Sequence, residues 1–532
     1  MGSGIAGLYV ALRSQELGLR PTLVTKASLE ESNTRYAQGG IAAAVGPDDA
    51  VGLHLKDTVR AGDGLVNAKA ARILVEEAPR RIADLVRFGV PFDTLEGQVA
   101  LGREAAHSRA RILHAGGDAT GLRIEETLRE RVVAAGIEVR ERAALRRIAP
   151  RPEGGWRAEL ALDGAADPTL LDASELVLAT GGAGNLYRET SNPAVAMGEG
   201  VAVAARAGVL LADMEFVQFH PTVFHREGAP RFLITEALRG EGAHLRNERG
   251  EPFMTRYHPL GDLAPRDVVT RAIRSEMERT RQPSVFLDAT HLSRDRLASR
   301  FPTVFRFLAD YALDPSRDLI PVAPAAHFTI GGIATDTEGR SSRTGLLACG
   351  EVAATGVHGA NRLGSNSLLE GLVFGEHVAR QLLHPVRGGP APPGAVVGVP
   401  PPHGAGGAVP AGAPSEIRSI LWEEVGIVRN AAGLQRALRR LASILDAIEP
   451  ADGGPAPAPG ADAAFTAYLI ARAALAREES RGAHYRSDFP RPRPAWRLHL
   501  GLRVGGAEER PTRAAAPARE VKALGASAVP WT

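Results

Sequence analysis

The start of the chain decides the fold: residues 1–26 read MGSGIAGLYVALRSQELGLRPTLVTK. Gly2, Gly4 and Gly7 match the pattern GxGxxG, in which the first two glycines allow a tight turn beside a pyrophosphate and the third allows helix–strand packing. Apolar periodicity over residues 5–18 predicts a helix, and PTLVTK at residues 21–26 predicts a strand. The unpaired N–H groups at the start of such a helix face the phosphates. We therefore predict a dinucleotide-binding α/β domain.

This motif departs from its usual form in two places. No strand precedes Gly2, so we expect either a misplaced start or a sheet that lacks its first strand. Lys26 stands where an acidic residue usually binds the ribose hydroxyls of the nucleotide. NAD held by that contact is therefore disfavoured, although a solvated strand end is an equally good interpretation of Lys26.

Alternating helices and strands continue outward from this motif. Residues 67–89 and 119–136 are expected to be helical, and residues 137–140 and 176–179 to be strands, which indicates a parallel α/β sheet. The remaining segments are an insertion of mixed character at 214–328 with a helix from about Pro265, a second part of the α/β domain at 329–384, a Pro/Gly/Ala linker at 385–414, a helical domain at 415–490 and a tail at 491–532 that we expect to be poorly ordered.

The composition excludes several classes of protein. With 63 basic and 61 acidic residues among 532, the formal charge of +2 gives no electrostatic case for binding nucleic acid or an anionic membrane. The lone cysteine, Cys349, cannot form an intramolecular disulfide or a thiolate cluster, and we expect it in the core. We find no apolar run of membrane-spanning length and no signal peptide, so we expect a soluble cytoplasmic enzyme.

A second glycine-rich segment, residues 324–375, carries the polar groups of a binding site. Its turns contain His327, Glu351, His358, Arg362 and Ser367 among apolar strand-like runs. Glycine allows the backbone to approach a ligand, while arginine and histidine supply donors for a carboxylate or phosphate. Two distant glycine-rich segments that converge on one cofactor suggest a flavoprotein with an anion-binding active site.

Several longer motifs resemble the L-aspartate oxidase family within the succinate dehydrogenase/fumarate reductase flavoprotein superfamily. They are NTRYAQGGIAA, HSRARILHAGGDATG, LATGGAGNLYRETSNP, EFVQFHPT, LITEALRGEGA, LAPRDVVTRAI, AAHFTIGG, HGANRLGSNSLLEGLV and, in the helical domain, LWEEVGIVRN and ALAREESRGAHYRSDFP. The resemblance implies an α/β fold in which a Rossmann-like FAD-binding domain carries an inserted α+β capping domain and a C-terminal helical domain.

The resemblance also implies FAD as cofactor. Membrane-bound relatives attach FAD through a histidine at the position of Asn33, and asparagine has no ring nitrogen for that bond, so the FAD is expected to be non-covalent. The expected cofactor contacts are Ser3, Gly4, Ile5, Ala6, Lys26, Asn33, Thr34, Arg35, Tyr36, Ala37, Gln38, Gly39, Gly40, Glu199, Glu351, Ser367 and Leu368.

The substrate implied by the resemblance is L-aspartate, whose two carboxylates and ammonium require anion clamps and one carboxylate. The clamps are expected to be His220, Thr235, His327 and Arg362, and Glu104 is expected to bind the ammonium, which succinate lacks. Arg266 is implied as the acid/base, sharing its proton with neighbours such as Arg239 or Glu241. A helix start at Pro265 with a solvated arginine is the alternative for Arg266.

The expected reaction is hydride transfer from aspartate to FAD, which gives iminoaspartate for quinolinate synthase on the route to NAD, with O2 or fumarate as electron acceptor. The capping domain would act as a lid. Two alternatives stay open. A soluble fumarate reductase or succinate oxidase shares the anion clamps, and a flavin-poor, non-catalytic remnant would explain the missing first strand.

Overall fold

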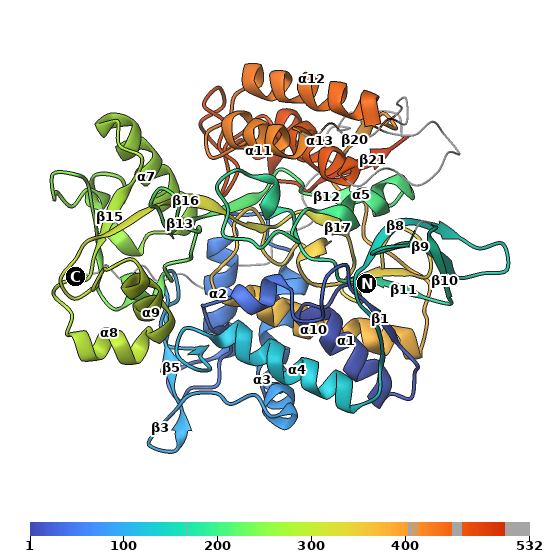
Figure 1. Cartoon of the computed structure of the whole chain (residues 1–532), viewed down its shortest axis with the longest axis horizontal. Coiled ribbons are helices and arrows are strands. Elements are labelled where there is room, and N and C mark those ends of the chain that lie inside the picture. Colours follow the sequence, from blue (N-terminus) through green and yellow to red (C-terminus); the bar gives the residue numbers. More distant parts are fainter. Residues whose placement is uncertain (166, 403–406, 408–409, 411, 449–459, 506–532) are drawn as a thin grey trace.

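A computed structural model describes residues 1–165, 167–402, 407, 410, 412–448 and 460–505. Three parts can be followed in Figure 1: a central α/β domain, a lobe that carries α7, α8 and β15 on the left, and a helical layer of α11–α13 at the top. This arrangement is the expected fold class. None of the helices in the described ranges combines the length and the apolar character that a membrane span requires.

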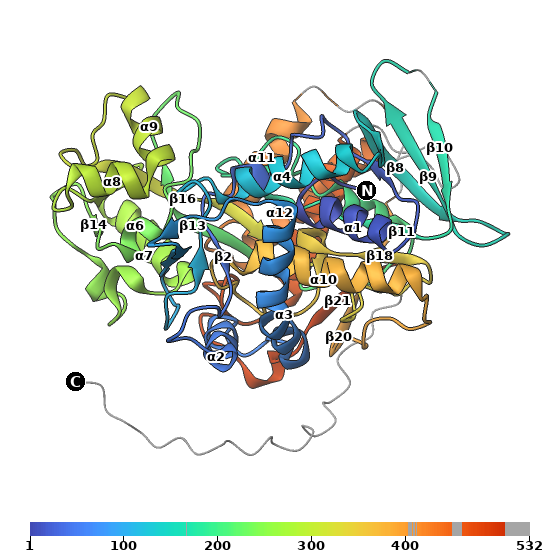
Figure 2. The same ribbon diagram turned by 90° about the horizontal axis from the view of Figure 1, so that it is seen from below.

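Helix α1 (Ile5–Glu16) forms the centre of the α/β domain, as the sequence predicts. Its apolar residues are buried, and it packs against α10 (Asn366–Leu383) and α4 (Thr120–Ala134). Helix α3 (Ala68–Phe88) packs on α10 in the same layer, which is visible from below in Figure 2. This layer also contains α2 (Val51–Ala61). A separate antiparallel sheet consists of β8 (Ala143–Pro150), β9 (Trp156–Leu162) and β10 (Thr169–Ala173), and α5 (Glu199–Arg206) lies against its strand β8.

The parallel layer of the domain contains two pairs of strands. Strand β1 (Thr22–Val24) pairs with β7 (Glu138–Arg140), and β11 (Leu176–Leu178) pairs with β18 (Leu346–Ala348). Met1 and Gly2 lie between the pairs, because Met1 N donates to Val177 O at 2.8 Å and Gly2 N donates to Val24 O at 2.8 Å. The strand expected before the glycine motif is thus represented by two residues that connect the pairs.

The inserted segment has its own sheet and its own core. Its strands are arranged in the order β13 (Val217–Phe224), β16 (Ile320–Thr329), β15 (Val285–Asp288) and β14 (His244–Arg246). A separate apolar core draws all its buried members from residues 224–322. The helices are α6 (Ala237–Gly240), α7 (Arg266–Thr280), α8 (Arg294–Arg300) and α9 (Pro302–Asp310). Helix α7 begins directly after Pro265, close to the predicted start.

The linker and the tail contain strands that we did not predict. Strand β20 (Ala395–Val399) lies in the linker and pairs in parallel with β21 (Leu500–Val504), which lies in the expected tail. Strand β21 also pairs with β12 (Leu211–Ala212), so it connects β20 to the rest of a five-stranded sheet. The order of this sheet is β19-β17-β12-β21-β20, where β17 is Gly332–Ala334 and β19 is Ala353–Ala354. The expectation of poor order was wrong for these residues, because their alternate side chains are buried in the core. Residues 506–532 lie outside the described part.

The C-terminal helical domain contains α11 (Ala413–Glu424), α12 (Ala431–Ile448) and α13 (Ala461–Ala476), which pack on one another, and α13 also packs on α5. The short strands of the first part are β2 (Ile41–Ala42), β3 (Thr94–Leu95), β4 (Gln98–Val99), β5 (Leu101–Gly102) and β6 (Ile112–Leu113). Strand β2 pairs with β6, which brings the residues after the Asn33–Gly40 segment beside the loop that carries Glu104.

Candidate active site

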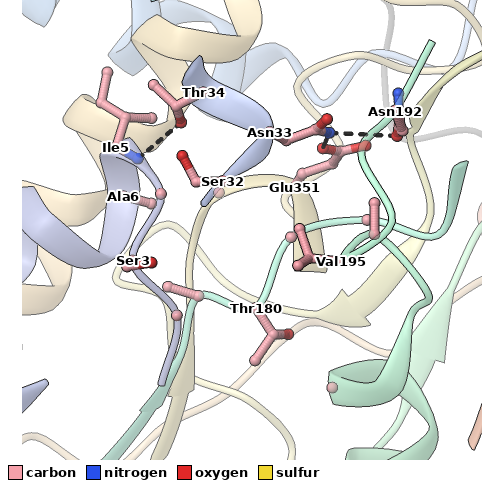
Figure 3. A pocket seen from close by; sticks show the side chains of 18 of the residues that line it. Ser3, Ile5, Ala6, Ser32, Asn33, Thr34, Thr180, Asn192, Val195 and Glu351 are labelled. Carbon is pink, nitrogen blue, oxygen red and sulfur yellow. Dashed lines mark hydrogen bonds between the residues drawn. The ribbon is translucent and has the colours of Figure 1, made fainter. Parts of the chain in front are cut away.

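One cavity contains most of the residues that the sequence assigned to a cofactor, and Figure 3 shows part of its wall. It runs from the N-terminus of α1 to His327, Phe328 and Arg362. The predicted residues that line it are Ser3, Gly4, Ile5, Ala6, Lys26, Asn33, Thr34, Tyr36, Ala37, Glu199, Glu351, Ser367 and Leu368. The two glycine-rich segments therefore meet at one cavity.

The phosphate end of this cavity fits a dinucleotide. A Cβ on Gly2 would lie 2.1 Å from Ala179 O, and one on Gly7 would lie 1.9 Å from Gly2 O, so neither site accepts a side chain. Gly4 gives helix α1 no side-chain cap, and Ile5 N donates to Thr34 Oγ1 at 2.9 Å (Figure 3), so the N–H groups of Ala6 and Gly7 are the ones left for a ligand at this helix end. The hydroxyls of Ser32 and Thr180 are buried there without a hydrogen-bond partner among the described residues.

Asn33 and Glu351 face each other in the wall of the cavity (Figure 3). Asn33 Nδ2 donates to Glu351 Oε2 at 3.0 Å, and Thr329 N donates to Glu351 Oε1 at 3.0 Å. Burial raises the pKa of the Glu351 carboxyl to about 7. The Asn33 amide is thus held by a carboxylate, and it offers no nitrogen that could bond covalently to a flavin.

The other predicted cofactor residues have different surroundings. Lys26 Nζ lies 2.5 Å from Glu199 Oε1, so the two residues form an ion pair in the cavity wall. Arg35 pairs instead with Glu125 at 3.4 Å and does not line the cavity. Gln38, Gly39 and Gly40 also lie outside the lining, and a Cβ on Gly39 would be 3.3 Å from Glu104 Oε1. This segment therefore borders both the cavity and the predicted substrate residues.

Arg362 is a buried cation available to a ligand. Its Nη1 donates to Ser367 Oγ at 2.9 Å, its guanidinium lies 4.3 Å from the centre of the Phe328 ring, and its Nε has no partner. Among the described residues it forms no ion pair with a carboxylate. Burial, followed by the charge of Arg266, lowers the pKa of Arg362 to about 9. An anionic ligand would supply the missing counter-charge.

His220 and His327, both from the capping domain, lie near this arginine, whose charge adds to burial in lowering the pKa of each ring. The His220 and His327 rings lie 5.2 Å apart, and burial lowers the pKa of both well below the usual value. Thr222 N donates to His220 Nδ1 at 3.3 Å, so the neutral ring carries its hydrogen on Nε2. Thr235 is buried at the start of α6. The two predicted clamp histidines are therefore brought together near Arg362, while Thr235 lies on the segment that leads into α6.

Arg266 lies at the N-terminus of α7 and bonds to Glu236, a residue that the sequence analysis missed. Its Nε donates to Glu236 Oε2 at 2.5 Å, and Arg239 Nη2 lies 3.5 Å from the same oxygen. The predicted partner Arg239 is thus in place. Glu241 was the wrong choice, because it pairs with Arg296 and Arg300 at the other end of α6.

Glu104 is buried beside this pair. Ser365 Oγ donates to Glu104 Oε2 at 2.8 Å. A Cβ on Gly364 would lie 2.7 Å from Glu104 Oε2, 3.0 Å from Glu236 Oε1 and 3.3 Å from Arg266 Nη2, so all three groups converge on this glycine. Burial, and then repulsion by Glu236, raises the pKa of Glu104 to about 7. The site therefore places a carboxylate among arginines.

Gln218, a second residue that the sequence analysis missed, joins the two arginines. Arg266 Nη1 donates to Gln218 Oε1 at 3.1 Å, and Gln218 Nε2 donates to Arg362 O at 2.8 Å. Both missed residues stand inside quoted motifs, Gln218 in EFVQFHPT and Glu236 in LITEALRGEGA. Their position next to predicted site residues was the only signal that could have found them.

Comparisons with protein families agree with this geometry. Residues 1–368 match the FAD binding domain family, and residues 461–513 match the fumarate reductase flavoprotein C-terminal family. An L-aspartate oxidase from Streptomyces coelicolor is 43% identical over 526 residues, which span 95% of this chain and 90% of that protein. One from Agrobacterium fabrum is 45% identical and covers 92% of this chain and 90% of that protein.

Solved structures give the same architecture. The flavoprotein FrdA of Escherichia coli quinol fumarate reductase, in a mutant form, has a TM-score of 0.80 at 29% identity and covers 93% of this chain and 91% of its own. Sdh1 of Mycobacterium smegmatis has a TM-score of 0.77 at 31% identity, with coverage of 96% and 94%. The match therefore spans the α/β domain, the inserted segment and the helical domain.

Proposed function

The chain belongs to the L-aspartate oxidase family of FAD-dependent flavoproteins, and on that premise we propose that it oxidises L-aspartate to iminoaspartate at its buried arginine–glutamate cluster, with bound FAD as the hydride acceptor. This reaction is the first step of the de novo route to NAD through quinolinate. The cavity would hold FAD non-covalently between the N-terminus of α1 and Arg362. The chemistry that FAD supplies when bound is acceptance of a hydride from the substrate Cα.

One observation carries the choice of substrate: a buried carboxylate, Glu104, lies among groups that suit a dicarboxylate. Succinate and fumarate offer nothing to pair with Glu104, whereas the ammonium of aspartate does. A site built to satisfy a polar group disfavours the analogue that lacks it, because Glu104 would then keep only its hydrogen bond from Ser365. The Glu104 carboxylate therefore favours an amino diacid over a plain diacid.

The remaining residues would bind the substrate carboxylates. Arg362 presents a guanidinium whose Nε has no hydrogen-bond partner in the described part of the chain, and His220 presents the hydrogen on its Nε2. With Thr235 and His327 they would fix both carboxylates and hold the Cα–H in one orientation. The capping domain supplies His220 and Thr235, so its closure over the cavity would exclude water.

Arg266 would act as the proton donor to the reacting carbon in fumarate reduction. Arginine stays protonated, so in fumarate reduction Arg266 is suited to donate a proton, and Arg239 would replace that proton by way of the Glu236 carboxylate that lies between the two arginines. In aspartate oxidation the ammonium must lose a proton. Glu104, whose pKa is raised to about 7, is placed to accept it.

The proposed electron acceptor is O2 or fumarate. Fumarate would bind to the same anion-binding residues as the substrate carboxylates. Because iminoaspartate hydrolyses in water, the enzyme that uses it should act near its site of formation. We propose quinolinate synthase as this downstream partner. We also propose a cytoplasmic location, which suits a chain whose single cysteine is free and buried.

A steady-state comparison tests the proposal. The purified flavin-loaded protein should form hydrogen peroxide with L-aspartate and little with succinate. Turnover of succinate with no reaction of L-aspartate would replace the proposal with the soluble fumarate reductase or succinate oxidase alternative. A colourless protein that binds no added FAD would favour the non-catalytic remnant.

A further inference from the structure

The hydrogen bonds of a buried histidine outside the reacting groups fix its tautomer. Arg111 Nη1 lies 3.2 Å from His107 Nδ1, and His107 Nε2 lies 3.1 Å from Gly364 O. An arginine only donates and a carbonyl only accepts, so Nδ1 carries the lone pair and Nε2 carries the hydrogen. Burial agrees with this neutral form, since it lowers the pKa of His107 to about 3.

The charged end of this chain of bonds is firmly held. Arg111 has no exposed surface and forms a bidentate ion pair with Asp49, with both N–O distances at 2.8 Å. Its Nη1 also lies 2.6 Å from Asp57 Oδ2. With the guanidinium anchored on two carboxylates, the His107 ring is held from behind and its Nε2 hydrogen points at one target, Gly364 O.

Gly364 is the position that the reacting groups share. A Cβ on Gly364 would lie within 3.3 Å of Glu104 Oε2, Glu236 Oε1 and Arg266 Nη2, so the backbone here is in close contact with all three groups. The next residue, Ser365, donates to Glu104 and has a left-handed backbone (φ 61°) that a non-glycine residue adopts only when its surroundings impose it. Two backbone contacts impose it here: Ala42 N donates to Ser365 O at 3.0 Å, and His107 holds the carbonyl of Gly364.

We propose that His107 is a positioning residue for substrate selection: its Nε2–H fixes the Gly364–Ser365 turn against Glu104, which keeps that carboxylate aimed at a substrate ammonium. His107 and Glu104 lie on one loop, and His107 N donates to Glu104 O at 3.2 Å. The histidine therefore ties the loop that carries the ammonium-binding residue to the turn that follows Arg362. The inference rests on the proposed function, because it concerns discrimination between aspartate and a plain diacid.

Two polar variants separate the two contacts of the ring. In His107→Asn the side-chain oxygen can replace Nδ1 toward Arg111, but the chain is too short to reach Gly364. In His107→Gln the longer amide can donate to Gly364 O from the place of Nε2. His114→Asn is the matched control, because His114 is also a buried histidine with a pKa lowered by burial, and it has no contact with Gly364.

The measurement is the ratio of kcat/KM for L-aspartate oxidation to kcat/KM for fumarate reduction in the flavin-loaded proteins. Loss of one hydrogen bond should lower this ratio about fivefold to tenfold in His107→Asn, mainly through the KM for L-aspartate. His107→Gln and His114→Asn should keep it within about twofold of the unaltered protein. An unchanged ratio in His107→Asn, or equal losses in the Asn and Gln variants, would overturn the inference.

The substrate preference of the unaltered protein shows whether a negative result concerns this inference or the proposed function. If it prefers succinate to L-aspartate, the proposed function itself fails. If it prefers L-aspartate and His107→Asn keeps that preference, only the role of His107 fails.

Discussion

The Nε of Arg266 lies 2.5 Å from Oε2 of Glu236, across two elements of the capping domain. Arg266 begins α7 and Glu236 immediately precedes α6, so the pair depends on the fold of this domain. Arginine near a buried carboxylate lowers the pKa of Glu236 although burial opposes it, and the carboxylate remains charged. Arg266 is therefore held in one orientation by an anion that is itself backed by Arg239.

Replacement of Arg266 by lysine should separate binding from chemistry. Lysine keeps the charge but loses the planar fork that reaches Glu236 and Gln218 together. We expect kcat for fumarate reduction to fall by about 10²–10⁴-fold, the range of a lost general acid, while flavin content stays normal. A Lys variant with unchanged kcat would show that Arg266 does not transfer the proton. Arg274→Lys, an exposed change on the same helix, is the control.

The pH dependence should have opposite signs for the two substrates. Glu104, whose pKa is raised to about 7, is neutral below that pH and negative above it. The value of kcat/KM for L-aspartate should therefore rise as the pH passes through about 7, because only the carboxylate attracts the ammonium. For fumarate it should fall over the same range, because the carboxylate repels a dianion. Profiles of kcat/KM between pH 5.5 and 8.5, roughly 1.5 units either side of that value, would measure both. Parallel profiles would count against the assignment.

Gly7 should be indispensable for the cofactor. A Cβ there would lie 1.9 Å from Gly2 O, so Gly7→Ala should displace the turn beside the phosphates and weaken flavin binding strongly. Gly52→Ala is the matched control, because Gly52 lies within α2 and a Cβ there meets nothing within 4 Å. Flavin content after gel filtration, read from visible absorbance, gives the result. Equal flavin content in the two variants would show that the turn tolerates a side chain.

Acid precipitation should release the flavin. The family resemblance implies a histidine at the position of Asn33 in membrane-bound relatives, whereas the Asn33 amide bonds to Glu351 and offers no nucleophilic ring nitrogen. Yellow colour should appear in the supernatant and not in the protein pellet. Flavin that stays in the pellet after denaturation would mean a covalent bond formed by some other residue.

The fold could largely be predicted from local patterns. The helices predicted at residues 67–89 and 119–136 match α3 and α4, because apolar periodicity and the glycine at each C-terminus are local signals. Strand β21 could not be predicted, since it adds to a sheet whose other strands lie about one hundred to three hundred residues away. Its glycine and arginine content also resembles that of the surrounding polar tail.

The sequence could name a site residue only where a family motif contains that residue and implies a role for it. Arg362, His220 and Arg266 lie together as expected, although their distances depend on how the capping domain sits on the cavity. The partner of Arg266 could not be predicted, because Glu236 and Glu241 stand on one short segment and only the turn of α6 decides which one faces inward. His107 was read as part of a motif without a role, since its bonds to Arg111 and Gly364 depend on tertiary contacts.

Replacement of Glu104 by glutamine tests the central claim most directly. The change keeps the size of the side chain and removes the charge that selects an amino diacid, so the measurement is kcat/KM for L-aspartate oxidation and for fumarate reduction in the same preparation. We predict that the value for L-aspartate falls by about a hundredfold, as for a lost buried charge pair, while the value for fumarate stays within about fivefold. Equal losses for both substrates would contradict the account.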